Sequence, residues 1–167
     1  MSVAPCYTRR VDVIRTVEGD LRVGDLRIAL VASRFNEAVV DRLVAGAVEA
    51  LVARGALRSG LELVRVPGAF DLPPVVRRIA ESGRYDAVVA LGAVIRGETA
   101  HFEYVAGECA AGLARVADET GVPVAFGVLT TESEEQALER AGGREGNKGA
   151  DAACAAIELA SLLRKLG

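Results

Sequence analysis

The only histidine of the chain, His101, stands in a short segment whose side chains could do chemistry together. Arg96, Gly97, Glu98 and Thr99 precede it within six residues. An imidazole titrates near neutral pH, so it can both give and take a proton. A turn that contains a glycine and a hydroxyl can offer backbone N–H groups to an anion, and a following helix adds the positive end of its dipole. The segment therefore indicates proton transfer beside a bound anion, while a histidine that only packs or caps is the open alternative.

Other candidate residues lie near the ends of predicted strands. Phe35 and Phe126 are two of only four phenylalanines, and either ring could stack on a planar heterocycle or simply close the edge of a sheet. Asp71 could accept a hydrogen bond from a polyol or cap the helix that follows it. Near a glycine-rich segment, Arg140 and Lys148 could bind an anion or belong to a solvated helix face. The residues alone leave each of these pairs of roles open.

Several common chemistries lose support because their motifs are absent. The chain has no phosphate-binding P-loop, no glycine fingerprint after its first strand, no zinc-protease motif, no nucleophile elbow and no EF-hand spacing. Its three cysteines are widely spaced and form no C-x-x-C pair: Cys6, Cys109 and Cys154. We therefore expect free thiols in a reducing cytosol, and neither a disulfide framework nor a zinc site.

The composition is typical of one globular domain with an aliphatic core. The 167 residues are 51% hydrophobic but only 4% aromatic, and this length predicts a single domain over residues 1–167. Twenty basic and 23 acidic residues give a net charge of -3, without a basic run that would bind nucleic acid. No stretch is long and apolar enough for a signal peptide or a membrane span. We expect a soluble, cytoplasmic protein without nucleic-acid or membrane partners.

Alternating strands and helices must position the candidate residues. Short apolar runs predict parallel strands that are buried on both faces, and amphipathic spacings predict helices between them. The expected strands are 26–32, 61–66, 86–94 and 122–129, and the expected helices are 36–54, 72–82, 101–120, 133–140 and 150–166, with a glycine-rich elbow at 141–149. We predict an α/β three-layer sandwich of the flavodoxin-like type, in which helices cover both faces of a central four-stranded parallel sheet.

The turns that follow the four strands form one candidate site. Ligands of open parallel sheets bind outside the carboxyl ends of the strands, and here small or polar residues fill these turns: 33–36, 67–71, 95–101 and 130–132. Asn36 is also a candidate N-cap of the first helix. Residues 1–24 are weakly patterned, and their β-leaning run at 11–17 could join the main sheet or add to a neighbouring subunit.

Four segments together resemble the 6,7-dimethyl-8-ribityllumazine synthase family from about Leu26 to the C-terminus. They read VASRFN at 31–36, VPGAFDLP at 66–73, GAVIRGETAHFEYV at 92–105 and GVLTTESEEQALERAGGREGNKGADAA at 127–153. The resemblance implies a transferase that condenses 5-amino-6-(D-ribitylamino)uracil with 3,4-dihydroxy-2-butanone 4-phosphate, the penultimate step of riboflavin biosynthesis. Phosphate and water leave. Because the nucleophile is the substrate's own amine, orientation and proton transfer suffice, and neither metal nor cofactor is implied.

The resemblance also implies substrate contacts at matched positions. The residues for the pyrimidine and ribityl groups are Phe35, Ala69, Phe70, Asp71, Val94 and Ile95. Phe35 would stack on the ring, residues 69–71 would contact the ribityl chain and the nearby ring edge, and Val94 and Ile95 would meet the ring through backbone groups.

A second set of matched positions would handle the phosphate and the protons. Glu98 and Thr99 would lie in the phosphate-binding turn and donate backbone N–H groups, and His101 would shuttle protons. Glu98 replaces a small residue of some relatives, so we expect its side chain to point away from the phosphate; Asp71 stands where others have Glu.

The family's assembly implies that a neighbouring subunit completes each site. Phe126 would close over the heterocycle, Arg140 would pair with the phosphate, and Lys148 would arrive with them. Members form pentamers, and in many of them twelve pentamers build a hollow icosahedral shell. The short elbow GGREGNKG at 142–149 is similar to that of shell-forming members, which implies a homo-oligomer of 60 subunits with riboflavin synthase as a candidate partner.

Two alternative functions stay open at this point. A non-catalytic shell protein that binds lumazine or flavin would need Phe35 but neither His101 nor Arg140. A generic flavodoxin-like binding module would be a monomer.

Overall fold

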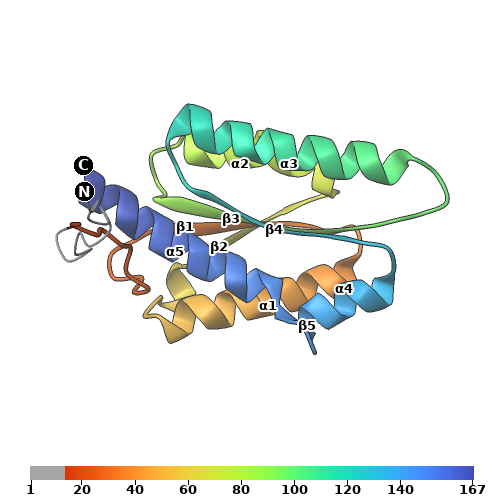
Figure 1. Cartoon of the computed structure of the whole chain (residues 1–167), viewed down its shortest axis with the longest axis horizontal. Helices are drawn as coiled ribbons and strands as arrows, with labels where there is room; N and C mark the ends of the chain where they lie inside the picture. The colour runs from red at the N-terminus through yellow and green to blue at the C-terminus, as the bar shows by residue number, and fades with distance from the viewer. Residues whose placement is uncertain (1–13) are drawn as a thin grey trace, which may run out of the picture.

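A four-stranded parallel sheet with helices on both faces forms the centre of the chain, which confirms the predicted α/β sandwich (Figure 1). The computed structural model describes residues 14–167. The strands run in the order β2-β1-β3-β4, and all three pairings are parallel. Their bounds are β1 Ile28–Ser33, β2 Glu62–Val66, β3 Ala87–Ile95 and β4 Val124–Thr131.

Five α-helices of the described residues cover the sheet, two on one face and three on the other (Figure 1). α2 (Leu72–Ala80) and α3 (His101–Thr120) lie on one face, and α1 (Glu37–Ala53), α4 (Glu134–Arg140) and α5 (Lys148–Leu166) lie on the other. Short 3-10 turns occur at Arg58–Gly60 and Ala69–Asp71. Prolines stand in the first turn of α2, where a missing N–H costs no hydrogen bond.

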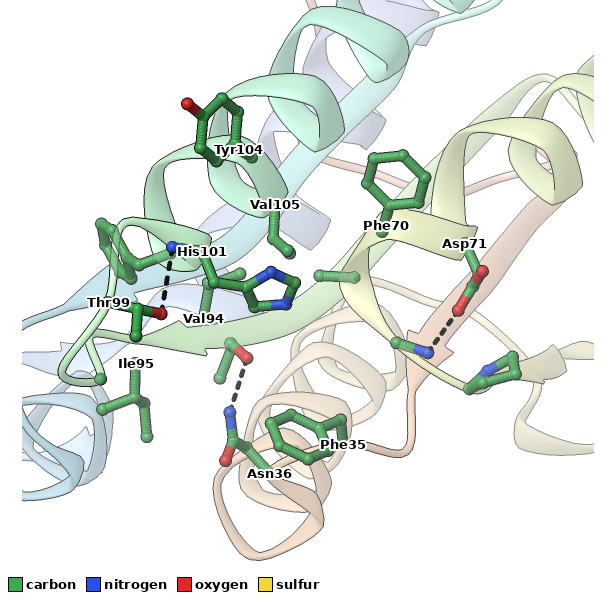
Figure 2. A pocket seen from close by; sticks show the side chains of 16 residues that line it. Phe35, Asn36, Phe70, Asp71, Val94, Ile95, Thr99, His101, Tyr104 and Val105 are labelled. Atoms are coloured by element: carbon green, nitrogen blue, oxygen red, sulfur yellow. Dashed lines mark hydrogen bonds between the residues drawn. The ribbon is translucent and has the colours of Figure 1, made fainter.

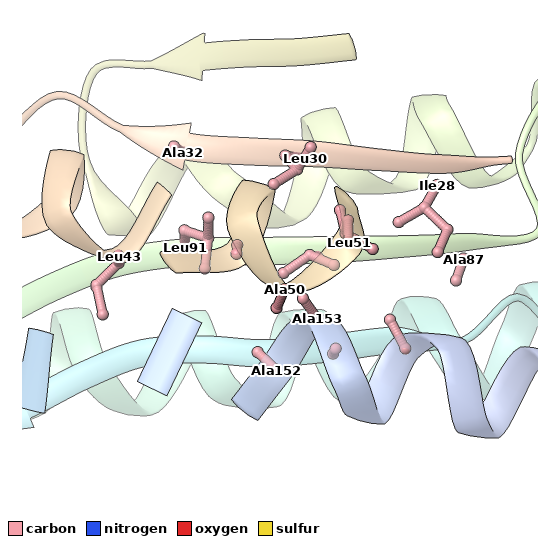
Figure 3. Packing of buried hydrophobic residues seen from close by; sticks show 14 of the residues in the cluster. Ile28, Leu30, Ala32, Leu43, Ala50, Leu51, Ala87, Leu91, Ala152 and Ala153 are labelled. Atoms are coloured by element: carbon pink, nitrogen blue, oxygen red, sulfur yellow. The ribbon is translucent and has the colours of Figure 1, made fainter. Parts of the chain in front are cut away.

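The alternation of side chains along β1 explains its continuous apolar sequence. Leu30 packs toward α1 and α5, whereas its neighbour Val31 packs toward α2 and α3. Figure 3 shows the first of these clusters, in which Leu30 and Leu91 of the sheet meet Leu51 of α1 and Ala153 of α5. All six residues of β1 are buried, so both faces of this strand must be apolar.

The close approach of α1 and α5 depends on a glycine. A Cβ atom at Gly149 would lie 2.1 Å from the backbone oxygen of Leu43, so α1 packs directly against the start of α5. Asn147 caps α5: its side-chain oxygen accepts from the N–H groups of Gly149 and Ala150, at 2.9 and 3.1 Å.

The predicted glycine-rich elbow therefore needs a correction. Its residues form a small hairpin, β5 (Ala141–Gly143) with β6 (Gly146–Asn147), and α5 begins at Lys148, two residues before the predicted start. Glycine disfavours helix in an isolated chain, which favours a loop at this position, whereas packing against α1 requires the glycine within the helix.

The described N-terminal segment runs along the end of α5. Residues 14–20 form no strand, so pairing with the main sheet is wrong for the described part of the 11–17 run, and residues 11–13 lie outside the described residues. The N–H of Asp20 donates to Ser161 Oγ at 3.0 Å, and Lys165 donates to the backbone oxygen of Glu18 at 2.8 Å. Between residues 14 and 167, no helix combines the length and the apolar character that crossing a membrane requires.

Candidate active site

A cavity of about 730 Å³ opens at the carboxyl ends of β1, β2 and β3 (Figure 2). The chain leaves β1 for α1 on one face of the sheet and leaves the adjacent β3 for α3 on the other face. This divergence is the topological switch point at which open parallel sheets bind ligands. The lining residues are Phe35, Asn36, Pro67, Gly68, Ala69, Phe70, Asp71, Ala93, Val94, Ile95, Gly97, Thr99, His101, Phe102, Tyr104 and Val105.

The turn after β1 presents an aromatic ring to this cavity. The side chain of Phe35 is 71% exposed, and its backbone N–H donates to the oxygen of Pro67 at 3.0 Å, which joins this turn to the one after β2. A phenylalanine so exposed gains little from packing within the chain, so its ring is available to stack on a ligand.

Asn36 lines the cavity within the predicted turn 33–36, but its side chain does not cap the first helix. It stands at the N-cap position of α1 but forms no side-chain cap. Its side-chain N–H instead donates to the backbone oxygen of Ala93 at 2.8 Å, which ties the β1 turn to β3 (Figure 2). The backbone of Asn36 has a φ of 59°, a conformation that asparagine tolerates better than most residues. An asparagine in a turn directly after a predicted strand was therefore the available sequence signal.

The Asp71 carboxylate closes the turn after β2. It accepts from the N–H of Gly68 at 2.8 Å, and the N–H of Asp71 donates back to the oxygen of Gly68 at 3.1 Å. Asp71 occupies the N-cap position of α2 without capping it, so of the two roles left open by the sequence, the cap of this helix is wrong. A carboxylate has acceptor capacity beyond one hydrogen bond, and that capacity remains for a polyol hydroxyl.

The turn from β3 to α3 brings the imidazole and a helix N-terminus to the same cavity. His101 is the first residue of α3, and its ring points into the cavity between the turns that carry Phe35 and Phe70 (Figure 2). Its backbone N–H lies 3.4 Å from Thr99 Oγ1. Gly97 also lines the cavity, whereas Glu98 is exposed and does not. The unpaired N–H groups of a helix's first turn form an anion-binding position.

The residues between 14 and 167 that line the cavity bring no permanent positive charge to it. None of its described lining residues is a lysine or an arginine, and Asp71 adds a negative charge. The arrangement can hold a planar ring, a polyol and a proton carrier. A phosphate would still need a cation from elsewhere.

Two of the predicted site residues meet in a different cavity, along β4, the outer strand of the described sheet. Phe126 is 46% exposed and shares a groove of about 330 Å³ with Lys148. The ammonium group of Lys148 is 2.8 Å from the Asp151 carboxylate. Phe126 pairs with Ala90 in the register of β4 with β3, so it lies within the strand and the prediction of a position at the strand's end is wrong.

Arg140 ends α4 and lines neither of these cavities. Its guanidinium donates to the backbone oxygen of Gln136 at 3.1 Å. The predicted residues are thus divided: Phe35, Ala69, Phe70, Asp71, Val94, Ile95, Thr99 and His101 share the first cavity, whereas Phe126 and Lys148 share the second.

Tyr104 and Phe102 are pocket residues that the sequence reasoning did not name. Tyr104 is 71% exposed and follows His101 by three residues, a spacing that places both on one face of a helix. From the sequence, this spacing could have indicated that Tyr104 lies beside His101 in the site. Within residues 14–167, no group of three or more His, Cys, Asp or Glu side chains is arranged to hold a metal ion.

The sequence matches a known family over nearly all of this architecture. A family model described as 6,7-dimethyl-8-ribityllumazine synthase matches residues 25–164, from just before β1 into the last turn of α5. A curated protein of that same name from Nitratidesulfovibrio vulgaris (strain DSM 19637 / Miyazaki F) is 50% identical over 153 residues. The alignment covers 92% of this chain and 98% of that relative.

Proposed function

The chain belongs to the 6,7-dimethyl-8-ribityllumazine synthase family, and we propose that the cavity at the carboxyl ends of β1, β2 and β3 is its own half of the active site. The protein is a transferase of riboflavin biosynthesis. It condenses 5-amino-6-(D-ribitylamino)uracil with 3,4-dihydroxy-2-butanone 4-phosphate and releases phosphate and water. The non-catalytic alternative is not favoured.

The aminouracil lies in the cavity between the turns after the first three strands. Phe35 stacks on its ring, since this exposed side chain has a free face. The ring edge meets the backbone groups of Val94 and Ile95, and the ribityl hydroxyls meet Asp71 and the neighbouring backbone of residues 69 and 70. Asp71 suits this role because its one internal hydrogen bond leaves acceptor capacity.

The phosphate of the second substrate binds at the N-terminus of α3. Backbone N–H groups near Glu98 and Thr99 donate to it, and the exposed side chain of Glu98 points away. The missing cation is Arg140 of a neighbouring subunit, because Arg140 does not line the cavity of its own chain. The phosphate thereby acquires a charge-assisted partner that the single chain lacks.

His101 moves protons while the substrates react with each other. The amine attacks the ketone carbonyl, and proton transfers accompany imine formation and phosphate elimination. The imidazole lies in the cavity with the aromatic and polyol-binding residues, where it can give a proton to a departing oxygen and take one from nitrogen or carbon. Holding two reactants in one cavity accounts for much of the acceleration in such reactions.

The assembly is a homo-oligomer with shared sites, a pentamer and in its full form a 60-subunit shell. The separation of Phe126 and Lys148 from the first cavity supports this proposal, because these residues reach a substrate only if the β4 edge of one subunit faces the cavity of the next. Riboflavin synthase is the candidate partner of the shell. A single domain spanning residues 1–167 and a cytoplasmic location complete the proposal, and the free thiols of Cys109 and Cys154 support the location.

The observation that carries the site assignment is the convergence of an exposed ring, an imidazole and a helix N-terminus on one cavity. Steady-state kinetics, followed by product absorbance, tests it with Phe35→Ala. We expect the KM for the aminouracil to rise roughly tenfold, the usual cost of a lost stacking partner. Leu57→Ala, at an equally exposed apolar residue outside the cavity, is the control. An unchanged KM in Phe35→Ala would refute the assignment.

A further inference from the structure

Arg96 stands where β3 leaves the sheet but does not line the cavity, although its neighbours Ile95 and Gly97 do. Its backbone N–H donates to the oxygen of Thr131, the last residue of β4, at 2.9 Å. Its side chain pairs with Glu132 and Glu103, and neither of these residues lines the cavity. None of the substrate contacts assigned above uses Arg96.

The guanidinium group joins three side chains from two elements. Its Nε is 2.8 Å from the carboxylate of Glu132, which follows β4, and its Nη1 is 3.3 Å from the carboxylate of Glu103 in the first turn of α3. Its carbon lies 4.3 Å from the centre of the Phe102 ring. A planar guanidinium can stack on a ring and donate at its edge to two carboxylates at once, which an ammonium cannot do.

These contacts enclose the turn that carries the proposed phosphate donors. Residues 97–101 lie between Arg96 on one side and Phe102 and Glu103 on the other, so the side chain of Arg96 reaches across the turn and holds its two ends. Phe102 itself lines the cavity, one residue after His101. The contact with Glu132 fixes the same group to the sheet, because Glu132 adjoins the end of β4 and its N–H donates to the side chain of Gln136 at 3.1 Å.

We propose that Arg96 is a positioning residue, which sets the geometry of the turn at residues 97–101 and so the affinity for the phosphorylated ketone. The inference rests on the proposed binding of the phosphate at this turn. Arg96 acts through geometry and not as an anion ligand, because two carboxylates already accept from its guanidinium. Displacing donors by about an ångström can cost up to roughly a hundredfold in rate, so a rigid turn matters to the reaction.

Two substitutions and one matched control test the proposal in the assembled enzyme. Arg96→Gln removes both ion pairs and the stacked guanidinium, and Arg96→Lys keeps the charge without the planar group. Arg84→Gln is the control, because Arg84 also pairs with a carboxylate, Glu62 at 3.6 Å, and lies over a ring, Tyr85 at 5.0 Å, but precedes β3 at the other end of the sheet.

For both Arg96 variants we expect the KM for the butanone phosphate, and the inhibition constant of inorganic phosphate, to rise roughly tenfold. The KM for the aminouracil should stay within about twofold, and the melting temperature within about 3 °C, of the Arg84→Gln values. The split between the two substrates is the informative result, since a merely structural loss would alter both.

Several outcomes would overturn the proposal. Wild-type behaviour of Arg96→Lys would show that charge alone suffices, and an equal rise of both KM values in Arg96→Gln would show a general structural role. The variant Arg140→Ala distinguishes a failure of the positioning role of Arg96 from a failure of the proposed phosphate site. If Arg140→Ala raises the KM for the ketone and Arg96→Gln does not, only the positioning role fails; if neither does, the phosphate assignment fails with it.

Discussion

His101 occupies the first position of α3 with an exposed side chain, so water can reach the imidazole before the substrates bind. Its neighbours in the cavity position rings and hydroxyls, and none of them provides an activated nucleophile. The amine of the substrate supplies the nucleophile instead. At the residue scale, the proposed mechanism therefore gives the histidine a supporting role in a reaction that depends mainly on the placement of two molecules.

Because placement contributes more than proton transfer, removal of the imidazole should cause a partial loss of activity. We expect His101→Ala to lower kcat by roughly 10²-fold, the lower end of what proton transfer by a placed group contributes, with assembly unchanged. His101→Asn, which keeps a hydrogen-bonding group without the proton transfer, should lose about as much. Turnover measured by product absorbance would contradict the role if His101→Ala retained the wild-type rate.

A second prediction at this scale concerns a cysteine that takes no part in the chemistry. Cys109 is completely buried in α3, and burial raises the pKa of its thiol to about 11. At pH 8 only roughly one thiol in a thousand is then ionised, and reagents cannot reach it. We expect iodoacetamide to alkylate Cys109 in the urea-unfolded chain and to leave it unmodified in the folded protein. Peptide mapping by mass spectrometry would refute this if both states reacted at the same rate.

The sequence predicted which residues lie in this site better than it predicted the hydrogen-bond partners of their side chains. His101, Thr99 and Phe35 are identifiable from residue type and from their place after strands, and they share one cavity. The usual local role of an asparagine at the position of Asn36 is a helix cap, but the partner of its side chain, Ala93, lies 57 residues away. A contact of that sequence separation has no signal in local spacing.

At the scale of elements, close contact between α1 and α5 fixes one helical layer of the molecule. Their approach leaves no room for a side chain at Gly149, and the hairpin before α5 turns the chain into this position. The same hairpin follows α4, whose last residue is Arg140. Packing between these helices thus places the residue that the neighbouring site is proposed to use.

Gly149→Ala should therefore destabilise the fold, because its Cβ would meet the backbone of Leu43. We expect a loss of about 3 kcal/mol, the upper part of the range for overpacking. Gly107→Ala is the matched control, since Gly107 lies in α3 with open space around its Cβ, and the change should stabilise by roughly 0.5–1 kcal/mol. Urea unfolding at one protein concentration would contradict the expected clash if both variants behaved alike.

A second contact between elements, at the amino ends of the strands, makes stability depend on pH. Burial alone would raise the pKa of Asp86, but the hydrogen bonds from the backbone of Arg27 at 2.7 Å and from Arg164 of α5 at 3.1 Å outweigh it and lower the pKa below its usual 3.8. The folded state thus binds this proton more weakly than the unfolded state. The stabilisation by ionised Asp86 is complete at pH values above the usual pKa of 3.8. It is lost as the pH falls through the lower pKa that Asp86 has in the folded protein.

We expect Asp86→Asn to cost about 1–2 kcal/mol at pH 7, with a difference from the wild type that shrinks as the pH falls below about 4. Asp41→Asn, which breaks the surface pair with Arg65, should cost less than about 1 kcal/mol. Thermal unfolding between pH 3 and pH 7 measures both. If the destabilisation by Asp86→Asn grew at low pH, the pKa of Asp86 would be raised in the folded state and not lowered.

Element boundaries were predictable in this chain because strand and helix patterns alternate clearly. α3 begins and ends where its amphipathic pattern predicted, and the four strands agree within two residues. The start of α5 was missed because a glycine in the sequence indicates the end of a helix. In the structure, Gly149 lies within α5 and allows α1 to pack closely against it. Phe126 stands inside the predicted strand 122–129 and inside β4 alike. The apolar sequence did not reveal that β4 is the outer strand of the described sheet, which leaves this ring exposed.

At the scale of the whole molecule, the division of site residues between two cavities is the central feature. The first cavity has an aromatic ring, an imidazole and a helix N-terminus but no lysine or arginine among its described residues, and the β4 edge carries an exposed ring and a lysine. The first cavity lacks the cation that the β4 edge carries, and the β4 edge lacks the imidazole. The first cavity of one subunit facing the β4 edge and the Arg140 of the next would complete both.

Complementation between two defective chains tests this sharing most directly. One chain carries Phe35→Ala with His101→Ala, and the other carries Arg140→Ala. Coexpressed in equal amounts, they should form assemblies in which about one quarter of the sites combine an intact cavity with an intact Arg140 from the neighbour. With the ketone held well below its KM, we predict product formation at about a quarter of the wild-type rate per subunit, well above the mean of the two homogeneous variants; a rate equal to that mean would show that each site belongs to one chain.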